Sequence, residues 1–391
     1  MNKVLPPLLA SPAPAVLALA DGTTFEGFAA GPPAVASGEV VFNTSAHGYQ
    51  EMVSDPSYRG QILVLTTPHV GVVGTNEHDQ ESARCWAEAM IVPDLEAIPS
   101  SWRSERGLLE RLAGAGVPVA WGFDTRALVL HVRRFGALPG VLSCGDALSP
   151  EDLLARAAST RGTDGCDLVR QVACTAIGYW REGPWLAAGE ARAVHGHAPR
   201  VAVVDCGVKR SILRRLVGSG AEVVVVPPDF GADDILALRP RGVVVSNGPG
   251  DPAAVAGVAD TIRGLLGTLP LLGICLGHQL LALALGGRTF KLRFGHHGAN
   301  HPVRDERTGL VWITSQNHNY AVDPASLPKD ARVSLVNLTD GTVEGIVDAP
   351  LRAEGIQFHP EAGPGPHDAL AVFDRFVQRC RRRSPQRGGS Q

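Results

Sequence analysis

The stretch that decides the fold of the second half of this chain is Leu271-Leu272-Gly273-Ile274-Cys275-Leu276-Gly277-His278-Gln279. Its apolar start predicts a short buried strand, and the leucine-rich run at 280–285 predicts a helix behind it. A cysteine between two glycines at such a junction has the geometry of a nucleophile elbow, because the glycines let the chain turn sharply and expose the sulfur. The first free amides of the helix then point at the sulfur and can donate to an oxyanion. The stretch therefore predicts Cys275 as the nucleophile of an α/β enzyme.

A second motif, Phe358-His359-Pro360-Glu361, supplies the partners that such a thiol needs. His359 and Glu361 are two residues apart, so in an extended segment both side chains leave the same face of the strand. Glu361 can then orient His359 while His359 faces the thiol. A lone buried cysteine is usually inert, and a lone His-x-Glu is usually a surface pair. The combination nevertheless predicts a catalytic triad of Cys275, His359 and Glu361.

Alternating strand and helix patterns surround the elbow. Such alternation predicts a doubly wound, mostly parallel sheet with helices on both faces and with ligands at the carboxyl ends of the strands. A different pattern of shorter strands follows and ends in a closing helix at 367–379, which predicts a mixed extension. The predicted strands of the parallel part are 201–204, 223–226, 243–245 and 271–274, and those of the extension are 311–314, 333–336, 344–347 and 354–358.

The first half of the chain has another character. Strands at 16–20 and 23–28 around Asp21-Gly22 predict a hairpin, further strands are expected at 40–42 and 62–66, and a helix is expected at 108–112. These predict a mixed β/α domain. We expect an N-terminal domain over 1–197, with a core to about 148 and then a connecting segment, a second domain over 198–385, and a basic tail at 386–391.

The composition limits the class of protein. A chain of 391 residues should form two or three domains. Its formal net charge of −3 gives no case for binding nucleic acid or an anionic membrane. No run approaches the roughly 20 apolar residues that cross a bilayer. We therefore expect neither nucleic acid nor a membrane as a partner.

The cysteines and the N-terminus bear on the cellular compartment. Seven cysteines are scattered without metal spacing, which favours a reducing cytoplasm. The first twenty residues imitate a secretory signal, but Pro6, Pro7, Pro12 and Pro14 interrupt the apolar stretch. We expect a cytoplasmic protein.

Three further stretches bear on the substrate. The loop Ser246-Asn247-Gly248-Pro249-Gly250-Asp251-Pro252 follows a strand, and Gly248 and Gly250 let backbone amides approach a ligand closely. Gln279 lies one helical turn after Cys275 and so on the same face. Gln316-Asn317-His318-Asn319-Tyr320 is expected as a polar loop that can hydrogen-bond a small amino acid.

With these motifs, residues 200–380 resemble a class I (triad) glutamine amidotransferase domain. The resemblance implies that the cysteine attacks the side-chain amide of glutamine, that ammonia leaves, and that water hydrolyses the glutamyl thioester. The family pattern falls on Cys275, His359 and Glu361. It also implies that Gly248, Gly250 and Leu276 lie near the substrate and its oxyanion, and that Gln279, Asn317, Asn319 and Tyr320 help to bind glutamine.

The first half resembles the small-chain family of carbamoyl-phosphate synthase, and so does the whole chain. The resemblance implies a glutaminase subunit in a heterodimer, or a higher oligomer, with a large ATP-using chain. That complex makes carbamoyl phosphate for arginine and pyrimidine biosynthesis, and ammonia reaches the large chain through a tunnel. It also implies that Ser45 reaches the bound glutamine. The matching stretches are 38–45, 48–51, 55–58, 68–69, 74–76, 124–126, 294–298, 300–303 and 363–368.

No cofactor is expected on this chain, because ATP, magnesium and bicarbonate are used by the large subunit in that family. The chain agrees, since it has no Gly-rich phosphate loop followed by Lys and Ser or Thr. One alternative is another triad amidotransferase, such as the glutaminase chain of anthranilate synthase, which lacks a first domain with residues 42–45. A second alternative, a scaffold protein that has lost the reaction, would need a broken triad.

Some positions depart from the family pattern. Asn319 replaces the usual glycine and Tyr320 the usual phenylalanine; asparagine tolerates left-handed backbone angles, so we expect the site to survive. Cys206 replaces an aromatic residue and is expected to pack in the core.

Other motifs carry no predicted chemistry. His296, His297 and His301 are expected to have a structural or tunnel-side role and to bind no metal, since no cysteine or carboxylate cluster accompanies them in the sequence. Asp124-Thr125-Arg126 is expected to be a helix cap.

Overall fold

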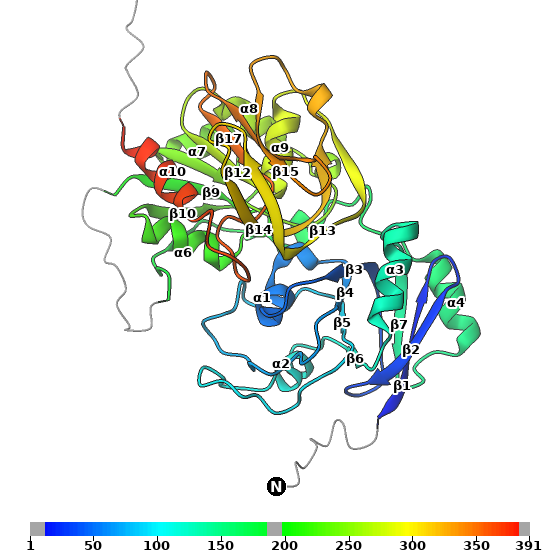
Figure 1. Ribbon diagram of the computed structural model, residues 1–391. Helices are drawn as coiled ribbons and strands as arrows, with labels where there is room; N and C mark the ends of the chain where they lie inside the picture. Colours follow the sequence, from blue (N-terminus) through cyan, green and yellow to red (C-terminus); the bar gives the residue numbers. More distant parts are fainter. Residues whose placement is uncertain (1–11, 186–197, 383–391) are drawn as a thin grey trace, which may run out of the picture.

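The computed structural model describes residues 12–185 and 198–382. The expected domain boundary near His197 and the basic tail at 386–391 lie outside the described residues. Two β-sheets organise the rest of the chain: a closed barrel in the first half and a ten-stranded sheet in the second (Figure 1).

The barrel has the strand order β1-β2-β6-β5-β4-β3-β7, and β1 closes it by pairing with β7. The expected hairpin is present, with Gly22 at a φ of 87° in its turn. Within the barrel, β3 pairs in parallel with β4, β4 with β5, and β5 with β6. The bounds are β1 (Ala13–Leu19), β2 (Thr24–Ala29), β3 (Ala34–Asn43), β4 (Gln61–Leu65), β5 (Ala89–Ile91), β6 (Val119–Trp121) and β7 (Pro139–Cys144).

Short helices connect and cover the barrel strands. The predicted cap is confirmed, because the Asp124 side chain accepts a hydrogen bond of 2.8 Å from the Ala127 N–H at the start of α3. The elements are α1 (Tyr49–Ser54), the 3-10 turn η2 (Pro56–Tyr58), α2 (Leu108–Gly114), α3 (Thr125–Phe135) and α4 (Pro150–Ser159).

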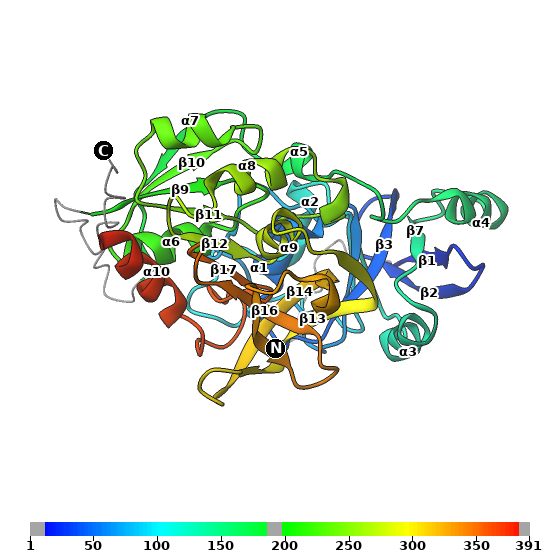
Figure 2. The same cartoon turned by 90° about the horizontal axis from the view of Figure 1, so that it is seen from above.

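The second half contains the predicted doubly wound sheet. Strands β17, β12, β11, β9 and β10 lie side by side in parallel. Alternate residues of these strands face opposite layers, and Figure 2 shows α7, α8 and α9 on one side of the sheet and α6 and α10 on the other. The bounds are β9 (Arg200–Val204), α6 (Arg210–Gly218), β10 (Glu222–Val226), α7 (Ala232–Ala237), β11 (Gly242–Val245), η3 (Pro252–Ala254), α8 (Val258–Leu265), β12 (Leu271–Ile274), α9 (Leu276–Ala284), β17 (Ala353–Ile356) and α10 (Ala371–Arg381).

An antiparallel extension continues the sheet beyond β17. It contains β13 (Thr289–Asp305), β14 (Val311–Val322), η4 (Pro324–Ser326), β15 (Arg332–Asn337) and β16 (Val343–Asp348). The prediction of a polar loop at 316–320 is wrong, because these residues continue β14 and pair with β13. Their side chains are polar yet buried, so the alternation of apolar and polar residues that marks a half-buried strand is missing. Figure 1 shows β13 and β14 on the side of the second sheet that faces the barrel.

The segment that joins the two halves contributes a strand to the second sheet. It includes α5 (Val169–Val172) and β8 (Gly178–Trp180), and β8 pairs antiparallel with β10 as the last strand of the second sheet. This segment is therefore built into the second sheet.

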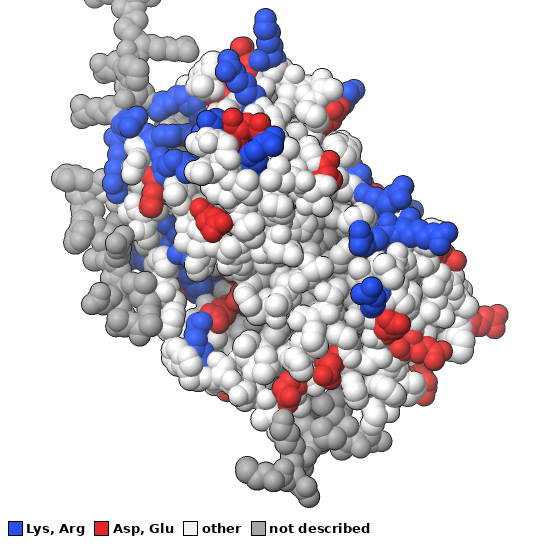
Figure 3. Space-filling model, viewed as in Figure 1, with Lys and Arg blue, Asp and Glu red and all other residues white. Residues whose placement is uncertain are grey.

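Charged side chains of both signs are mixed over the surface. On the face drawn in Figure 3, Lys and Arg gather near α3 and near α10, with Asp and Glu between and below them. Within the described residues, no helix combines the length and the apolar character that crossing a bilayer requires.

Candidate active site

Cys275 lies between β12 and α9, at the carboxyl edge of the parallel strands. Its φ of 54° and ψ of −107° place it in the positive-φ region that non-glycine residues rarely adopt. A Cβ atom on Gly273 would lie 2.4 Å from the Gly277 carbonyl oxygen, and one on Gly277 would lie 2.1 Å from that of Val245. Both glycines are therefore required by close backbone packing, and the geometry is that of a nucleophile elbow.

The other two predicted triad residues lie beside the cysteine. His359 Nδ1 is 2.7 Å from Glu361 Oε1, and both side chains are buried. His359 Nε2 makes no hydrogen bond in the described part of the chain, and Cys275 lies near enough to raise the pKa of the imidazole. The His359 N–H donates to the Ser315 carbonyl on β14 at 2.9 Å, which fixes the backbone of this segment. The structure thus brings the three residues together.

The charged groups of the triad stabilise one another's ionised forms and so shift one another's pKa values. Burial would lower the pKa of His359, but the Glu361 carboxylate and Cys275 oppose it and raise that pKa to about 10. Burial would raise the pKa of Glu361, but the Lys209 ammonium and His359 lower it to about 2. His359 is therefore protonated and Glu361 ionised at neutral pH, which places an acid next to the sulfur.

Lys209 is a site residue that the sequence reasoning missed. Its Nζ lies 3.0 Å from Glu361 Oε1 and donates to the carbonyl oxygens of Ala362 and Gly363, each at 2.8 Å. Glu81, from the first half of the chain, lies 3.9 Å away on its other side. Burial would lower the pKa of Lys209, yet Glu361 and Glu81 raise it above its ordinary value. The available signal was its place just beyond β9, at the edge where doubly wound sheets bind ligands.

A small, mainly polar pocket lies beside Cys275. Residues of the barrel, of the connecting segment and of the second sheet all contribute to it. Its lining comprises Ser57, Gln61, Thr163, Gly248, Pro249, Gly250, Cys275, Gln279, His297, Asn317, His318, Asn319 and Tyr320. Most of the residues expected to contact glutamine therefore lie around one cavity.

Two of the expected residues are not among this lining. Ser45 is buried, and its N–H donates to Asn43 Oδ1 at 2.8 Å. Leu276 packs under the Gly-Pro loop, where its Cδ2 would be 2.9 Å from a Cβ atom on Gly248. A role for Leu276 would use its backbone amide at the start of α9.

The Gly-Pro loop approaches the elbow closely. A Cβ atom on Gly248 would lie 2.0 Å from the carbonyl oxygen of Cys206, so only glycine fits there without movement. Gly250 has a φ of 93°, and its Cβ would lie 2.6 Å from the Cys166 carbonyl oxygen. Cys206 itself is fully buried in the apolar core, and burial raises the pKa of its thiol well above the usual value. This agrees with the expected packing role.

Amide side chains around the pocket bond mainly to protein groups. Gln279 Nε2 donates to the Tyr320 carbonyl at 2.9 Å and to Gln357 at 3.1 Å, and Asn317 Nδ2 donates to Asp55 at 3.1 Å. Asn319 Nδ2 donates to Glu39 at 2.8 Å. The tolerance of asparagine for left-handed backbone angles is not needed at residue 319, because Asn319 lies within β14 and its φ is not positive.

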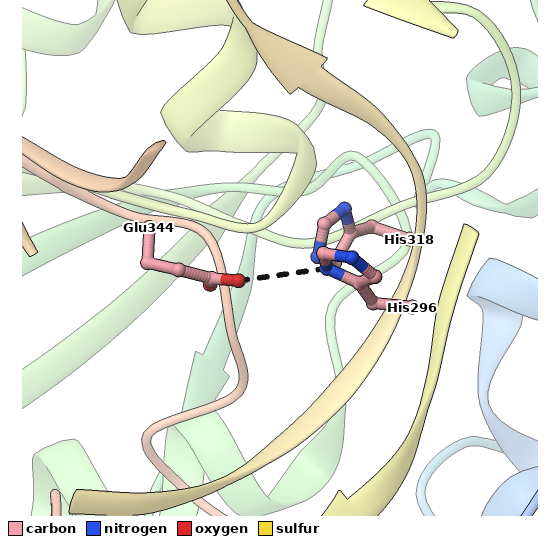
Figure 4. A group of neighbouring side chains, drawn as sticks. All are labelled: His296, His318 and Glu344. Atoms are coloured by element: carbon pink, nitrogen blue, oxygen red, sulfur yellow. Dashed lines mark ion pairs between the residues drawn. The ribbon is translucent and has the colours of Figure 1, made fainter. Parts of the chain in front are cut away.

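Strand pairing places another histidine and carboxylate side chains next to the histidines of β13. His296 on β13, His318 on β14 and Glu344 on β16 present ligand-type atoms that all lie within 4.8 Å of one another (Figure 4). The expectation that no carboxylate accompanies these histidines is wrong, because strand pairing brings Glu344 and Asp340 to His296 from distant positions in the sequence. The His301 ring is 5.3 Å from that of His296 and does not belong to this group.

His296 lies between two carboxylates. Its Nε2 is 2.8 Å from Asp340 Oδ2, and its Nδ1 is 3.6 Å from Glu344 Oε1. Burial lowers the pKa of His296, but hydrogen bonding and charge from Glu344 and Asp340 leave it above its usual value. A proton on His296 therefore offsets part of the negative charge of the two carboxylates. His297 instead lines the pocket, with its ring nitrogens 3.0 and 2.9 Å from the amide oxygens of Asn317 and Asn319.

Comparison with known proteins agrees with this geometry. The family model "Glutamine amidotransferase class-I" matches residues 202–379. The second half is therefore a class I glutamine amidotransferase domain. A further model, "Carbamoyl-phosphate synthase small chain, CPSase domain", matches residues 17–142.

Whole-chain relatives extend the match over both halves. The carbamoyl phosphate synthase small chain of Syntrophotalea carbinolica is 47% identical over 364 residues, which cover 93% of this chain and 96% of the relative. That of Thioalkalivibrio sulfidiphilus is 46% identical, covering 93% and 97%. That of Archaeoglobus fulgidus is 46% identical, covering 94% and 99%. This chain belongs to the family of carbamoyl phosphate synthase small chains.

The packing at Gly248 gives a first prediction. In Gly248→Ala the new methyl group overlaps the Cys206 carbonyl, so the Gly-Pro loop must move away from the elbow. We expect the rate of glutamate release from glutamine to fall on the order of 100-fold, as when an oxyanion donor is lost. The control is Gly114→Ala, which places its methyl group in open space. Equal rates in the two variants would contradict the close-approach role of Gly248.

The carboxylates around His296 give a second prediction. A raised folded-state pKa stabilises the fold fully below the unfolded value of about 6.5, and this contribution is lost as pH rises through the higher folded value. The thermal midpoint of His296→Gln should therefore fall below that of the wild type by more at pH 6 than at pH 9. The control is the exposed His47→Gln. A difference that does not depend on pH, or stoichiometric metal in the purified protein, would contradict a proton at this site.

Proposed function

We propose that this chain hydrolyses L-glutamine to glutamate and ammonia at Cys275 and provides the ammonia to a large, ATP-using carbamoyl phosphate synthase subunit. The observation that carries the proposal is the complete Cys275, His359 and Glu361 triad beside a polar pocket. The whole-chain similarity to small chains supports the same reaction.

The first step is attack of the Cys275 sulfur on the side-chain carbonyl carbon of glutamine. A C–S bond forms, and the carbonyl electron pair moves onto oxygen. We assign the stabilisation of this oxyanion to the backbone amides of Leu276 and of the Gly-Pro loop around Gly248. His359 then donates its proton to the departing nitrogen, the C–N bond breaks, and ammonia leaves a glutamyl thioester on Cys275.

The second step returns the enzyme to its starting state. His359, now neutral, takes a proton from water as the water oxygen attacks the thioester carbonyl carbon. The C–S bond breaks, glutamate leaves, and the sulfur and imidazole recover their starting charges. Glu361 keeps the imidazole oriented throughout, and Lys209 keeps Glu361 ionised.

Glutamine recognition is assigned to Ser45, Gly248, Gly250, Leu276, Gln279, Asn317, Asn319 and Tyr320. Because the amides of Gln279, Asn317 and Asn319 already bond to protein groups, their contribution falls mainly to main-chain atoms and to pocket shape. Ser45 requires a local rearrangement to reach the substrate, since it does not line the pocket.

The partner is assigned as the large subunit in a heterodimer or a higher oligomer, with ATP, magnesium and bicarbonate used there and no cofactor on this chain. The names of the relatives, which are small chains, support a larger companion. We assign the N-terminal domain to 1–197 and the glutaminase domain to 198–385. The match of residues 17–142 to the small-chain domain disfavours the anthranilate synthase alternative. Seven free cysteines support a cytoplasmic location.

Replacing the nucleophile tests the proposed function. In the complex of Cys275→Ser with the large subunit, glutamine-dependent carbamoyl phosphate synthesis should fall at least 1000-fold, because a serine hydroxyl is a weaker nucleophile than the thiol. Synthesis from added ammonia should persist, because only the ammonia source is removed. Both rates are measured as carbamoyl phosphate formed.

The matched control is Cys380→Ser, at a buried cysteine of α10 far along the chain from the elbow. It should retain both activities. Loss of ammonia-dependent synthesis in a correctly assembled Cys275→Ser complex would contradict a role limited to supplying ammonia. Failure of a large ATP-using chain to co-purify with the wild type would contradict the assigned partner.

A further inference from the structure

A short segment of the connecting region forms part of the wall of the candidate glutamine pocket. This cover segment comprises residues 162–168, between α4 and α5, and it has no regular secondary structure. Thr163 is buried and lines the same pocket as Cys275, whereas Asp164 points to the surface with 65% of its side chain exposed. The segment therefore reaches from the pocket wall to solvent.

The barrel holds the cover segment from its inner side. Glu39 on β3 is fully buried, and its Oε2 accepts hydrogen bonds from the Thr163 N–H at 3.1 Å and from Thr163 Oγ1 at 3.3 Å. The same oxygen lies 2.6 Å from Lys291 Nζ, so its charge is paired. A buried, charge-paired carboxylate with several donors is a strong anchor, and it fixes Thr163.

Strands β13 and β14 hold the segment from its outer side. Asp164 Oδ1 accepts a hydrogen bond of 2.6 Å from the Tyr320 hydroxyl and lies 2.9 Å from Lys291 Nζ. Lys291 and Tyr320 are directly opposite each other in the antiparallel pair, so both side chains reach the same carboxylate oxygen. Of the three side chains only that of Asp164 is largely exposed, at 65%, because Tyr320 is buried and Lys291 exposes 23% of its side chain. Solvent therefore reaches this contact from the Asp164 side.

The Gly-Pro loop supplies a third attachment. The Gly165 N–H donates to Asp251 Oδ2 at 3.0 Å, and the Asp251 N–H donates to the Cys166 carbonyl at 3.1 Å. The cover segment thus contacts the barrel, β14 and the loop that approaches the elbow. Cys275 exposes only 2% of its surface beneath these parts. Glutamine cannot reach the sulfur unless something at the mouth moves.

We propose that the cover segment opens to admit glutamine and closes over it, and that the Tyr320–Asp164 hydrogen bond is the latch that favours the closed state. The Tyr320 hydroxyl and Asp164 are positioning groups, because they act through the placement of Thr163 and the loop and not on the reacting atoms. The assigned part of Tyr320 in glutamine recognition falls to its main chain and ring, which Tyr320→Phe keeps. The proposal rests on the proposed glutaminase function. It also gives the Tyr320 hydroxyl a role, because that hydroxyl takes part in neither of the two chemical steps.

Removing the hydroxyl alone tests the latch. In Tyr320→Phe and in Asp164→Asn the closed state is weakened, so KM for glutamine should rise about tenfold, the lower end of the range for a hydrogen bond to a charged group. The kcat value should stay within about twofold, because the triad is untouched. In the double variant KM should rise no further than in the larger single variant, since both changes remove the same contact.

A second readout follows access to the pocket directly. The alkylation rate of Cys275 by iodoacetamide, measured by peptide mass spectrometry against buried Cys380, should rise in both variants by a similar factor. The control is Tyr179→Phe, which removes the hydroxyl of an exposed tyrosine on β8. Its KM and alkylation rate should match those of the wild type.

The two readouts also separate this proposal from the function on which it rests. Unchanged KM and unchanged Cys275 alkylation in both variants would overturn the latch. So would a fall in kcat together with the thermal midpoint and without a rise in KM, since that indicates a purely structural contact. A wild type that hydrolyses no glutamine would overturn the proposed function, and the alkylation rates would still report whether the cover segment opens.

Discussion

The rest of the site depends on one buried carboxylate, that of Glu361. An uncompensated charge at this depth would cost several kcal/mol. Here His359 and Lys209 contact the carboxylate at 2.7 and 3.0 Å, and neither cation would itself be stable in the interior without it. The group is thus a set of mutually dependent charges. Removing one leaves the others unpaired, which explains why the imidazole is both protonated and rigidly oriented.

The same charge set joins the two halves of the molecule. Lys209 also lies near Glu81, whose carboxylate accepts hydrogen bonds from Ser211 at the start of α6. Burial raises the pKa of Glu81, whereas Lys209 and Ser211 oppose that effect. The barrel side therefore contributes directly to the electrostatics of the triad. Replacing Glu81 would therefore change the electrostatic environment of His359, because the Lys209–Glu361 and Glu361–His359 ion pairs connect the two.

Local sequence patterns predicted the parts of the fold that local chemistry determines. The strands at 201–204 and 223–226 are apolar on both faces because helices cover both sides, and such runs are easy to recognise. The triad was predictable because the Cys275 elbow and the His359 motif each consist of a few adjacent residues. β14 was predicted only in part, since its buried end is polar and is stabilised by groups from Asp55 and Glu39 far away in sequence. Lys209 and Glu344 were missed for the same reason: their partners come from other strands and, for Lys209, partly from the other half of the chain.

The connecting region has a consequence for how the chain can be divided. β8 pairs with β10 through Gly178, Tyr179 and Trp180, and the sheet ends there. A fragment that begins at residue 198 would leave the backbone groups of β10 unpaired along a valine-rich edge, a template for pairing with other chains. Such a fragment would be prone to aggregate even though it contains the whole triad. The smallest glutaminase unit that can be expressed on its own must therefore begin well upstream of the sheet's first parallel strand.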